Sequence, residues 1–399
     1  MSASELPSGD VHVLDTLQAR GFINQCTDWD GLKNHLEEPR TFYIGFDPTA
    51  DSLHVGSLVQ LMIMAHLSRA GHHAIAIVGG GTAKVGDPSG RDSVREILDE
   101  ERLERNKAGI GVQIGKFCTG KMVDNAEWLD GLGYITLLRE IGRHFSINDM
   151  LRAESVKQRL DRQQGLSFIE FNYVLLQSYD YLELFRRHNC TLQVGGGDQW
   201  YNIVSGMDII RRLEGGTSFG LTTPLLTTAS GAKMGKTAAG AVWLDPAKVS
   251  PFDYYQYWYN VDDRDIAKFM RLFTWLPLDE IERVVAGDFR DAKRVLAREA
   301  TAVLHGTERA LQAESAAIAA FSGGVSADMP TVQIALPATL IDVLVGAGLA
   351  GSNGEARRLI QGGGVSIGKN KVADIKAMVE APEVVWAGKK RAVRVENAS

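Results

Sequence analysis

The segment TFYIGFDPTADSLHVGS at 41–57 places one histidine between an expected strand and an expected helix. The apolar run Thr41–Phe46 precedes a proline-containing loop, and the amphipathic pattern Leu58–Ala70 ends at a glycine, so His54 is predicted to lie at a helix N-terminus. The free backbone N–H groups and the helix dipole favour a phosphate there, and Gly56 allows a flat ring to approach the backbone. The segment therefore predicts a nucleotide site, although a lone histidine at a helix start is often only a cap or a core residue.

Two further segments carry residues suited to binding anions. The run AIAIVGGGTAKVGDPSGR at 74–91 is a second apolar strand leading into glycines, and it contains or precedes Asp87, Arg91 and Arg95. Far downstream, KMGKT at 233–237 places two lysines in a glycine-containing loop. Basic side chains on loops beside a helix N-terminus are groups that can stabilise the charge of a triphosphate.

In this order the three segments resemble the class I aminoacyl-tRNA synthetases, and the residues between them resemble tyrosyl-tRNA synthetase of the bacterial type. HVGS stands at the histidine–glycine–histidine signature, and KMGKT stands at the lysine-rich catalytic loop. Ser57 replaces the second histidine of the signature, so a shorter hydroxyl stands where a group near ATP is expected. The likeness covers nearly the whole chain and includes GFDPTADSLH, GDPSG, YVLLQSYDYL at 173–182 and QVGGGDQWYN at 193–202.

The resemblance implies that the chain joins L-tyrosine to ATP, releases pyrophosphate, and transfers tyrosine to the 3′ end of tyrosine tRNA. Such activation requires positioning and charge stabilisation but no side-chain nucleophile. The sequence accordingly has no apparent serine–histidine–aspartate or cysteine–histidine arrangement. Mg²⁺ is expected to arrive with ATP, and neither a tightly bound cofactor nor a protein metal site is expected.

The resemblance also implies roles for individual residues. The residues expected to act on the phosphates and in catalysis are Thr49, His54, Ser57, Arg91, Arg95, Lys233, Lys236 and Thr237. Those expected to bind tyrosine are Tyr43, Asp87, Tyr173, Gln177, Asp180, Gln193 and Gln199, with Tyr43 and Asp180 on the phenolic oxygen. Those expected to bind ATP are Gly45, Asp47, His54, Gly56, Gly196, Asp198 and Lys236. Lys84 has no assigned role.

Composition indicates an ordinary globular chain with more than one domain. The 399 residues are 45% hydrophobic and 23% charged, and no apolar stretch reaches the length of a membrane span. The polar N-terminus does not resemble a secretory signal, and three scattered cysteines do not have a metal-binding spacing. We therefore expect a cytoplasmic protein that does not associate with membranes.

The expected fold is α/β. Residues 1–245 alternate strand-like and helix-like runs, which predicts a doubly wound, Rossmann-like parallel sheet as the catalytic domain. The largely helical stretch from about 120 to 189 is interpreted as an insertion, which the resemblance makes part of a homodimer interface. An α-helical domain on the anticodon side is expected at 246–323, and a glycine-rich linker at 324–336.

A small α+β RNA-binding module of the ribosomal-protein type is expected at 337–399. This stretch has nine basic and six acidic residues, net +3, whereas the rest of the chain has −9. A helix starting near Ser352, then a strand and a basic turn, would present cations to a phosphate backbone. The residues expected to bind RNA are Arg357, Arg358, Lys369 and Lys371.

Three alternatives remain open at this stage. A P-loop phosphotransferase is suggested by the glycine–lysine run that begins at Gly231, but this run is one residue short of the motif, and the run Gly81–Gly86 continues with Asp-Pro. A tRNA-like-structure binder that has lost catalysis is suggested by Ser57. The related tryptophan enzyme is disfavoured by Tyr43 with Asp180.

Overall fold

A computed structural model describes residues 11–86, 99–163, 165–231, 234–237, 240–321, 330–368, 370–388 and 391–398. The chain divides into two compact units. The first comprises 1–248 together with 267–273 and 277–279, and the second comprises 249–266, 274–276 and 280–399. In the described part of the chain, no helix combines the length and the apolar composition that crossing a bilayer requires.

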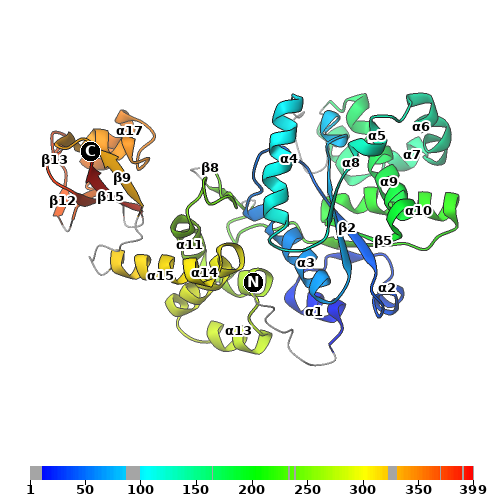
Figure 1. Cartoon of the computed structure of the whole chain (residues 1–399), viewed down its shortest axis with the longest axis horizontal. Helices are drawn as coiled ribbons and strands as arrows, with labels where there is room; N and C mark the ends of the chain where they lie inside the picture. Colours follow the sequence, from blue (N-terminus) through cyan, green and yellow to red (C-terminus); the bar gives the residue numbers. More distant parts are fainter. Residues whose placement is uncertain are drawn as a thin grey trace. The chain divides into compact units, whose positions relative to one another are not determined.

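The first unit is built on a six-stranded sheet in the order β1-β6-β5-β2-β3-β4. Its two central strands, β5 and β2, are labelled in Figure 1. Strands β2 to β6 pair in parallel, and only β1 is antiparallel, which confirms the predicted α/β fold. The strand order reverses between β2 and β5, and ligands of such sheets bind at this reversal. The strands are β1 (Gln25–Cys26), β2 (Thr41–Phe46), β3 (His73–Val78), β4 (Lys121–Asp124), β5 (Cys190–Gly196) and β6 (Phe219–Thr223).

Helix α3 (Leu58–Arg69) follows the first motif and is buried along almost its whole length. A 3-10 turn, Val55–Ser57, connects His54 to this helix, so the predicted strand, loop and helix are confirmed. The other helices of this unit before α10 are α1 (Val13–Arg20), α2 (Trp29–His35), α4 (Glu100–Ile114), α5 (Ala126–Leu129), α6 (Tyr134–Glu140), α7 (Ile147–Met150), α8 (Glu154–Asp161) and α9 (Phe168–His188).

Helices α5 to α9 occupy most of the stretch that we expected to be helical, but strand β4 lies at its start, and one helix expected from 147 to 160 is divided into α7 and α8. Helix α9 begins with a capping box, in which Ser167 and Glu170 satisfy each other's backbone N–H groups. It ends at Asn189 in the left-handed conformation. Helix α10 (Trp200–Glu214) lies beside α9, which fixes the long helix that carries Tyr173, Gln177 and Asp180 (Figure 1).

Residues 250–321 are helical, as predicted. Helix α11 (Pro251–Tyr259) contains the aromatic run, and Ser250 caps it by accepting from the backbone N–H of Asp253. Tyr254, Tyr255 and Trp258 are buried, so the run forms core packing rather than a surface for base stacking. The helices that follow are α12 (Ile266–Phe273), α13 (Leu278–Val285), α14 (Phe289–His305) and α15 (Thr307–Phe321).

The C-terminal module is a five-stranded sheet in the order β12-β11-β14-β15-β9, with two helices. Its strand β9 (Thr331–Ile334) pairs in parallel with β15 and lies inside the stretch that we expected to be a linker, so the module begins before Pro337. These residues belong to the module because they pair with β15, and the glycine-rich sequence just before them does not indicate this pairing. The remaining elements are β10 (Ala338–Thr339), α16 (Leu340–Gly346), α17 (Asn353–Gln361), β11 (Val365–Ile367), β12 (Asn370–Val372), β13 (Met378–Val379), β14 (Glu383–Ala387) and β15 (Arg391–Asn397).

Candidate active site

A cavity of about 420 Å³ opens at the C-terminal ends of β2, β3 and β5, where the strand order reverses. It gathers residues from segments that are far apart in the sequence. Fourteen of the expected site residues line it: Tyr43, Gly45, Asp47, Thr49, His54, Gly56, Ser57, Tyr173, Gln177, Asp180, Gln193, Gly196, Asp198 and Gln199.

One end of the cavity holds a buried carboxylate. Asp180 on α9 is 4% exposed, and it accepts hydrogen bonds from Nε1 of Trp128 at 2.7 Å and Nδ2 of Asn125 at 2.9 Å. Burial raises the pKa of Asp180 to about 7, and these two hydrogen bonds oppose the rise. A carboxylate in this setting has spare lone pairs, so it can accept a hydrogen bond from a ligand.

Tyr43 lies beside this carboxylate in the same cavity. Its hydroxyl is buried and has no hydrogen-bond partner among the described residues. Burial, together with the nearby Asp180, raises the pKa of the Tyr43 phenol well above its usual value, so the hydroxyl stays protonated. Two polar groups that the fold leaves available thus face one small space, and a ligand hydroxyl can satisfy both.

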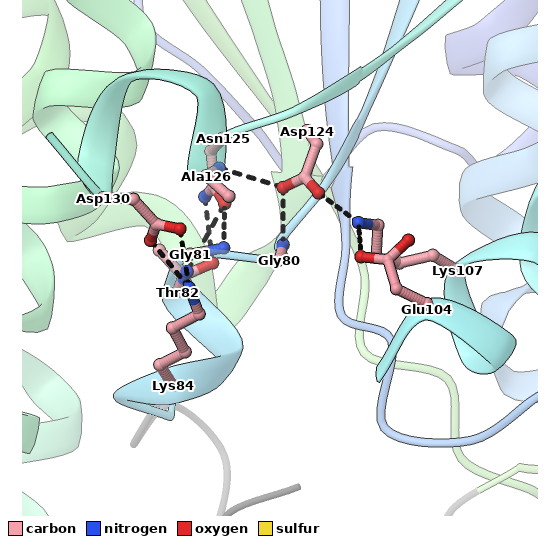
Figure 2. Close-up of polar contacts among 10 residues, drawn as sticks. All are labelled: Gly80, Gly81, Thr82, Lys84, Glu104, Lys107, Asp124, Asn125, Ala126 and Asp130. Atoms are coloured by element: carbon pink, nitrogen blue, oxygen red, sulfur yellow. Dashed lines mark hydrogen bonds and ion pairs between the residues drawn. The ribbon is translucent and has the colours of Figure 1, made fainter. Parts of the chain in front are cut away.

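Asn125 and Trp128 were not predicted from the sequence. Asn125 lies at the end of β4, and its Oδ1 accepts from the backbone N–H of Gly81 at 2.8 Å, while its Nδ2 donates to Oγ1 of Thr82 at 3.0 Å (Figure 2). The same Nδ2 also donates to Asp180. Asn125 therefore connects the turn after β3 to the buried carboxylate. The spacing of three residues between Asn125 and Trp128, at the start of a helix, was the only signal in the sequence that the two side chains share one face.

A second polar group lies along α9 and α10. Asn202, also not predicted, donates to Oε1 of Gln177 at 2.9 Å and to Oε1 of Gln199 at 3.2 Å. On β5, Oε1 of Gln193 is buried without a hydrogen-bond partner among the described residues. The three glutamines add hydrogen-bond donors and acceptors to the lining of the cavity.

His54 and Thr49, from the loop between β2 and α3, line the same cavity. Nδ1 of His54 accepts from the backbone N–H of Gly56 at 2.9 Å, so in the neutral ring the proton lies on Nε2, which is then a donor. Ser57 makes no side-chain capping bond to α3, and it lines the same cavity. A helix start with a histidine and two hydroxyls is suited to binding phosphate.

The glycine of the HVGS motif brings two signatures together. A Cβ at Gly56 would lie 2.6 Å from Cε1 of His54 and 3.1 Å from the carbonyl oxygen of Met234 in the KMGKT loop. Residues that follow that loop in the sequence also pair with the motif. The backbone N–H of Val55 donates to the carbonyl of Val242 at 2.9 Å, and His54 forms a β-bridge with Trp243. The glycine therefore makes room for this contact in addition to lining the cavity.

Gly45 shows the opposite situation. A Cβ at Gly45 would meet no atom within 4 Å, although the residue lies in the central strand β2. A side chain here would project into open space at the cavity wall, so the glycine keeps that space free for a ligand.

Several expected site residues lie outside the described part of the structure, namely Asp87, Arg91, Arg95, Lys233 and Lys369. Lys236 and Thr237 form the short strand β7, which pairs with β8 (Gly240–Ala241), and only their backbone is described. Lys84 has a structural partner, because its ammonium pairs with Asp130 at 2.7 Å on the surface (Figure 2). Among the described residues, no group of three or more His, Cys, Asp or Glu is placed to hold a metal ion.

The C-terminal module presents cations on its surface. Arg357 and Arg358 lie on α17, which Ser352 caps by accepting from the N–H of Glu355 at 3.2 Å, as the sequence predicted. Both arginines and Lys371 on β12 are exposed. These three residues are thus open to solvent and available to a phosphate backbone.

Comparisons with known proteins agree with this geometry. Residues 34–322 match the model for "tRNA synthetases class I (W and Y)", and residues 321–388 match the model for the "Tyrosine--tRNA ligase SYY-like C-terminal domain". The tyrosine–tRNA ligase of Caulobacter vibrioides is 49% identical, over 96% of this chain and 97% of that protein. The ligase of Nitrobacter winogradskyi is 52% identical over 93% of each chain.

Solved structures give the same result. A C-terminally truncated mitochondrial tyrosyl-tRNA synthetase from Aspergillus nidulans aligns with a TM-score of 0.69 at 28% identity, and the alignment covers 77% of this chain and 93% of that one. These matches give no support to a P-loop phosphotransferase or to a binder that has lost catalysis. The cavity geometry, the two family models and the full-length relatives lead to one conclusion: the chain belongs to the tyrosine–tRNA ligases of class I.

Proposed function

We propose that the chain activates L-tyrosine with ATP to form tyrosyl-adenylate and pyrophosphate, and then transfers tyrosine to the 3′ end of tyrosine tRNA. The observation that carries the proposal is that Asp180 and Tyr43 line the same cavity as His54 and Thr49. A phenol bound at Asp180 and Tyr43 would direct the carboxylate of the amino acid toward His54 and Thr49. ATP arrives with Mg²⁺, which offsets part of the phosphate charge.

Recognition of the substrate rests on its phenolic hydroxyl. That hydroxyl would donate to Asp180 and accept from Tyr43, so all three groups would be satisfied. Phenylalanine would leave the Tyr43 hydroxyl buried without a partner, and an unsatisfied buried polar group costs about 1–3 kcal/mol. The ammonium group of tyrosine is assigned to Tyr173, Gln177 and Asp87, and its carboxylate end to Gln193 and Gln199.

Catalysis then depends on holding two anions together. His54 donates from Nε2 and Thr49 from its hydroxyl to the phosphates, beside the N-terminus of α3. Ser57 adds a shorter donor where the family signature has its second histidine. The remaining residues assigned to the phosphates are Arg91, Arg95, Lys233, Lys236 and Thr237.

The nucleoside part of ATP is assigned to the ends of β2 and β5. Asp198 accepts from the ribose hydroxyls, and Asp47 lines the same cavity. Gly45, Gly56 and Gly196 allow the ligand to approach the backbone closely. All five residues line the cavity, which supports this assignment.

Two further proposals concern the partners of the chain. Arg357, Arg358, Lys369 and Lys371 bind tRNA phosphates, and the helices from α11 to α15 lie on the anticodon side. The chain forms a homodimer through the helices between β4 and β5, because large apolar side chains on those helices are exposed. These side chains are Tyr134, Ile135, Leu138, Ile147, Leu151, Phe168 and Ile169. The cytoplasm, which contains ATP and tRNA, is its proposed location.

The experiment that tests the function is the exchange of labelled pyrophosphate into ATP. Tyrosine should support exchange without tRNA, whereas phenylalanine and tryptophan at the same concentration should not. Exchange that is equal with all three amino acids, or absent with tyrosine, would refute the proposal. Sedimentation of the chain as a monomer would refute the dimer.

A further inference from the structure

One face of helix α4 holds the loop that carries the phosphate-binding residues. Asn106, Gly109 and Gln113 follow at spacings of three and four on α4, so they lie on the same face. Nδ2 of Asn106 donates to the carbonyl of Pro48 at 2.9 Å, next to Thr49. Oε1 of Gln113 accepts from the backbone N–H of Leu53 at 2.7 Å, next to His54.

Both of these amide side chains are buried. Asn106 is 3% exposed and Gln113 is 4% exposed. The second end of the Gln113 amide is also used, because Nε2 donates to Oγ of Ser52 at 2.9 Å. A buried amide that is satisfied at both ends has one fixed orientation, so it also fixes the backbone that it contacts.

The glycine between them permits the close approach. A Cβ at Gly109 would lie 2.1 Å from the carbonyl oxygen of Asp51, so a larger residue would push the helix and the loop apart. The loop is held from its other side as well, since the carbonyl of Leu53 accepts from the N–H of Leu244 at 2.8 Å, and Lys248 pairs with Asp51 at 2.7 Å.

Helix α4 is itself anchored to the sheet. The ammonium of Lys107 lies 2.5 Å from a carboxylate oxygen of Asp124 at the end of β4. Glu104 pairs with the same ammonium (Figure 2). The other oxygen of Asp124 accepts from the backbone N–H groups of Gly80 at 3.1 Å and Ala126 at 2.9 Å. A continuous set of polar contacts therefore runs from the turn after β3, through α4, to the peptide groups beside His54.

We propose that Gln113 and Asn106 are positioning residues for adenylate formation. They do not line the cavity, but they hold the 48–53 loop so that Thr49 and His54 face the phosphates of ATP in the reactive geometry. This inference rests on the proposed function, which it deepens. The tyrosine pocket lies on other elements, so a loss of this support affects ATP much more than tyrosine.

The test replaces Gln113 by methionine, which keeps the length and removes both hydrogen bonds. We expect the Gln113→Met chain to bind tyrosine within about twofold of the unmodified chain. Pyrophosphate exchange should show at least roughly a tenfold loss in kcat/KM for ATP. The amides of residues 52–57 should exchange hydrogen at least roughly tenfold faster.

Two variants serve as comparisons. Gln113→Glu keeps an acceptor for the N–H of Leu53, so it should recover part of the loss in kcat/KM for ATP. Val112→Ala changes the neighbouring residue of the same helix, whose side chain is 69% exposed. This variant should leave tyrosine binding, kcat/KM for ATP and the amide exchange unchanged. If Gln113→Met does not fold, Asn106→Asp, which replaces the donor to Pro48 by an acceptor, is judged by the same criteria.

The possible outcomes are distinct. A folded Gln113→Met chain with unchanged kcat/KM for ATP and unchanged amide exchange would overturn the inference while the function stands. Equal losses for ATP and tyrosine would show a general structural role and would also overturn it. If the unmodified chain shows no tyrosine-dependent exchange, the proposed function fails. In that case, amide hydrogen exchange and direct binding of an ATP analogue to the Gln113→Met chain still test the positioning role.

Discussion

Replacing Asp180 by alanine tests the phenol pocket with a magnitude that the structure supplies. The residue is 4% exposed, and the proposed contact is a hydrogen bond from a ligand hydroxyl to a charged acceptor. Such bonds contribute about 1.5–3 kcal/mol, so the Kd for tyrosine should rise roughly 10- to 150-fold in Asp180→Ala. The Kd for phenylalanine, which has no hydroxyl, should not rise.

The same substitution should leave the fold intact. Raising the pKa of Asp180 from near 4 to about 7 corresponds to a cost on the order of 4 kcal/mol for the ionised form in the folded chain. This cost is absent below about pH 4 and complete above about pH 7, because the folded state holds its proton longer than the unfolded state. Its removal offsets the loss of an acceptor for Nε1 of Trp128, about 1–3 kcal/mol.

Tyr43→Phe is the matched comparison. Its hydroxyl has no partner among the described residues, so removing it should not lower the free energy of unfolding, while the Kd for tyrosine should rise roughly 2- to 10-fold. Equilibrium dialysis at pH 8 with labelled tyrosine and phenylalanine measures these values, and thermal unfolding checks the fold. A Kd for tyrosine that stays within twofold in Asp180→Ala, or an equal loss for phenylalanine, would refute the reasoning.

Three further predictions use the same assays. Tyrosine binding should weaken as the pH falls through about 7, because protonated Asp180 is a weaker acceptor. The association constant for tyrosine at pH 6 should be roughly a tenth of its value at pH 8, and this dependence should disappear in Asp180→Ala. Gly45→Ala should fold normally but raise the KM for ATP, since its methyl group meets no protein atom and occupies the cavity wall; an unchanged KM would exclude ATP from this wall. Lys84→Ala should change the free energy of unfolding by less than about 1 kcal/mol and leave exchange kinetics unchanged, because both partners of its ion pair are half exposed; a large kinetic defect would instead place Lys84 in the reaction.

Local signals in the sequence were enough to predict the elements around the nucleotide end. The apolar run before Asp47 and the pattern after Ser57 gave β2 and α3 nearly to the residue, because both depend on short-range periodicity. The same is true of α17, where Ser352 and Gly362 mark the ends. The expected site residues followed from the resemblance, and fourteen of them meet in one cavity.

The contacts that support the site depend on tertiary structure and could not be predicted. Asp180 is 52 residues from Trp128 and 55 from Asn125, and Gln113 is 60 residues from Leu53. The neighbouring sequence does not indicate these long-range pairings, because Asp180 and Gln113 are ordinary polar helix residues until the helices pack on the sheet. The position of β9 in the C-terminal module was missed for the same reason, since its pairing with β15 is non-local.

The most direct test of the central claim is a crystal structure of the chain with a non-hydrolysable analogue of tyrosyl-adenylate. We predict that the phenolic oxygen lies within hydrogen-bond distance of both Asp180 and the Tyr43 hydroxyl, while the group that replaces the phosphate lies on the side of His54 and Thr49. An analogue bound in the reverse direction, or with its phenol outside contact with Asp180, would contradict the account.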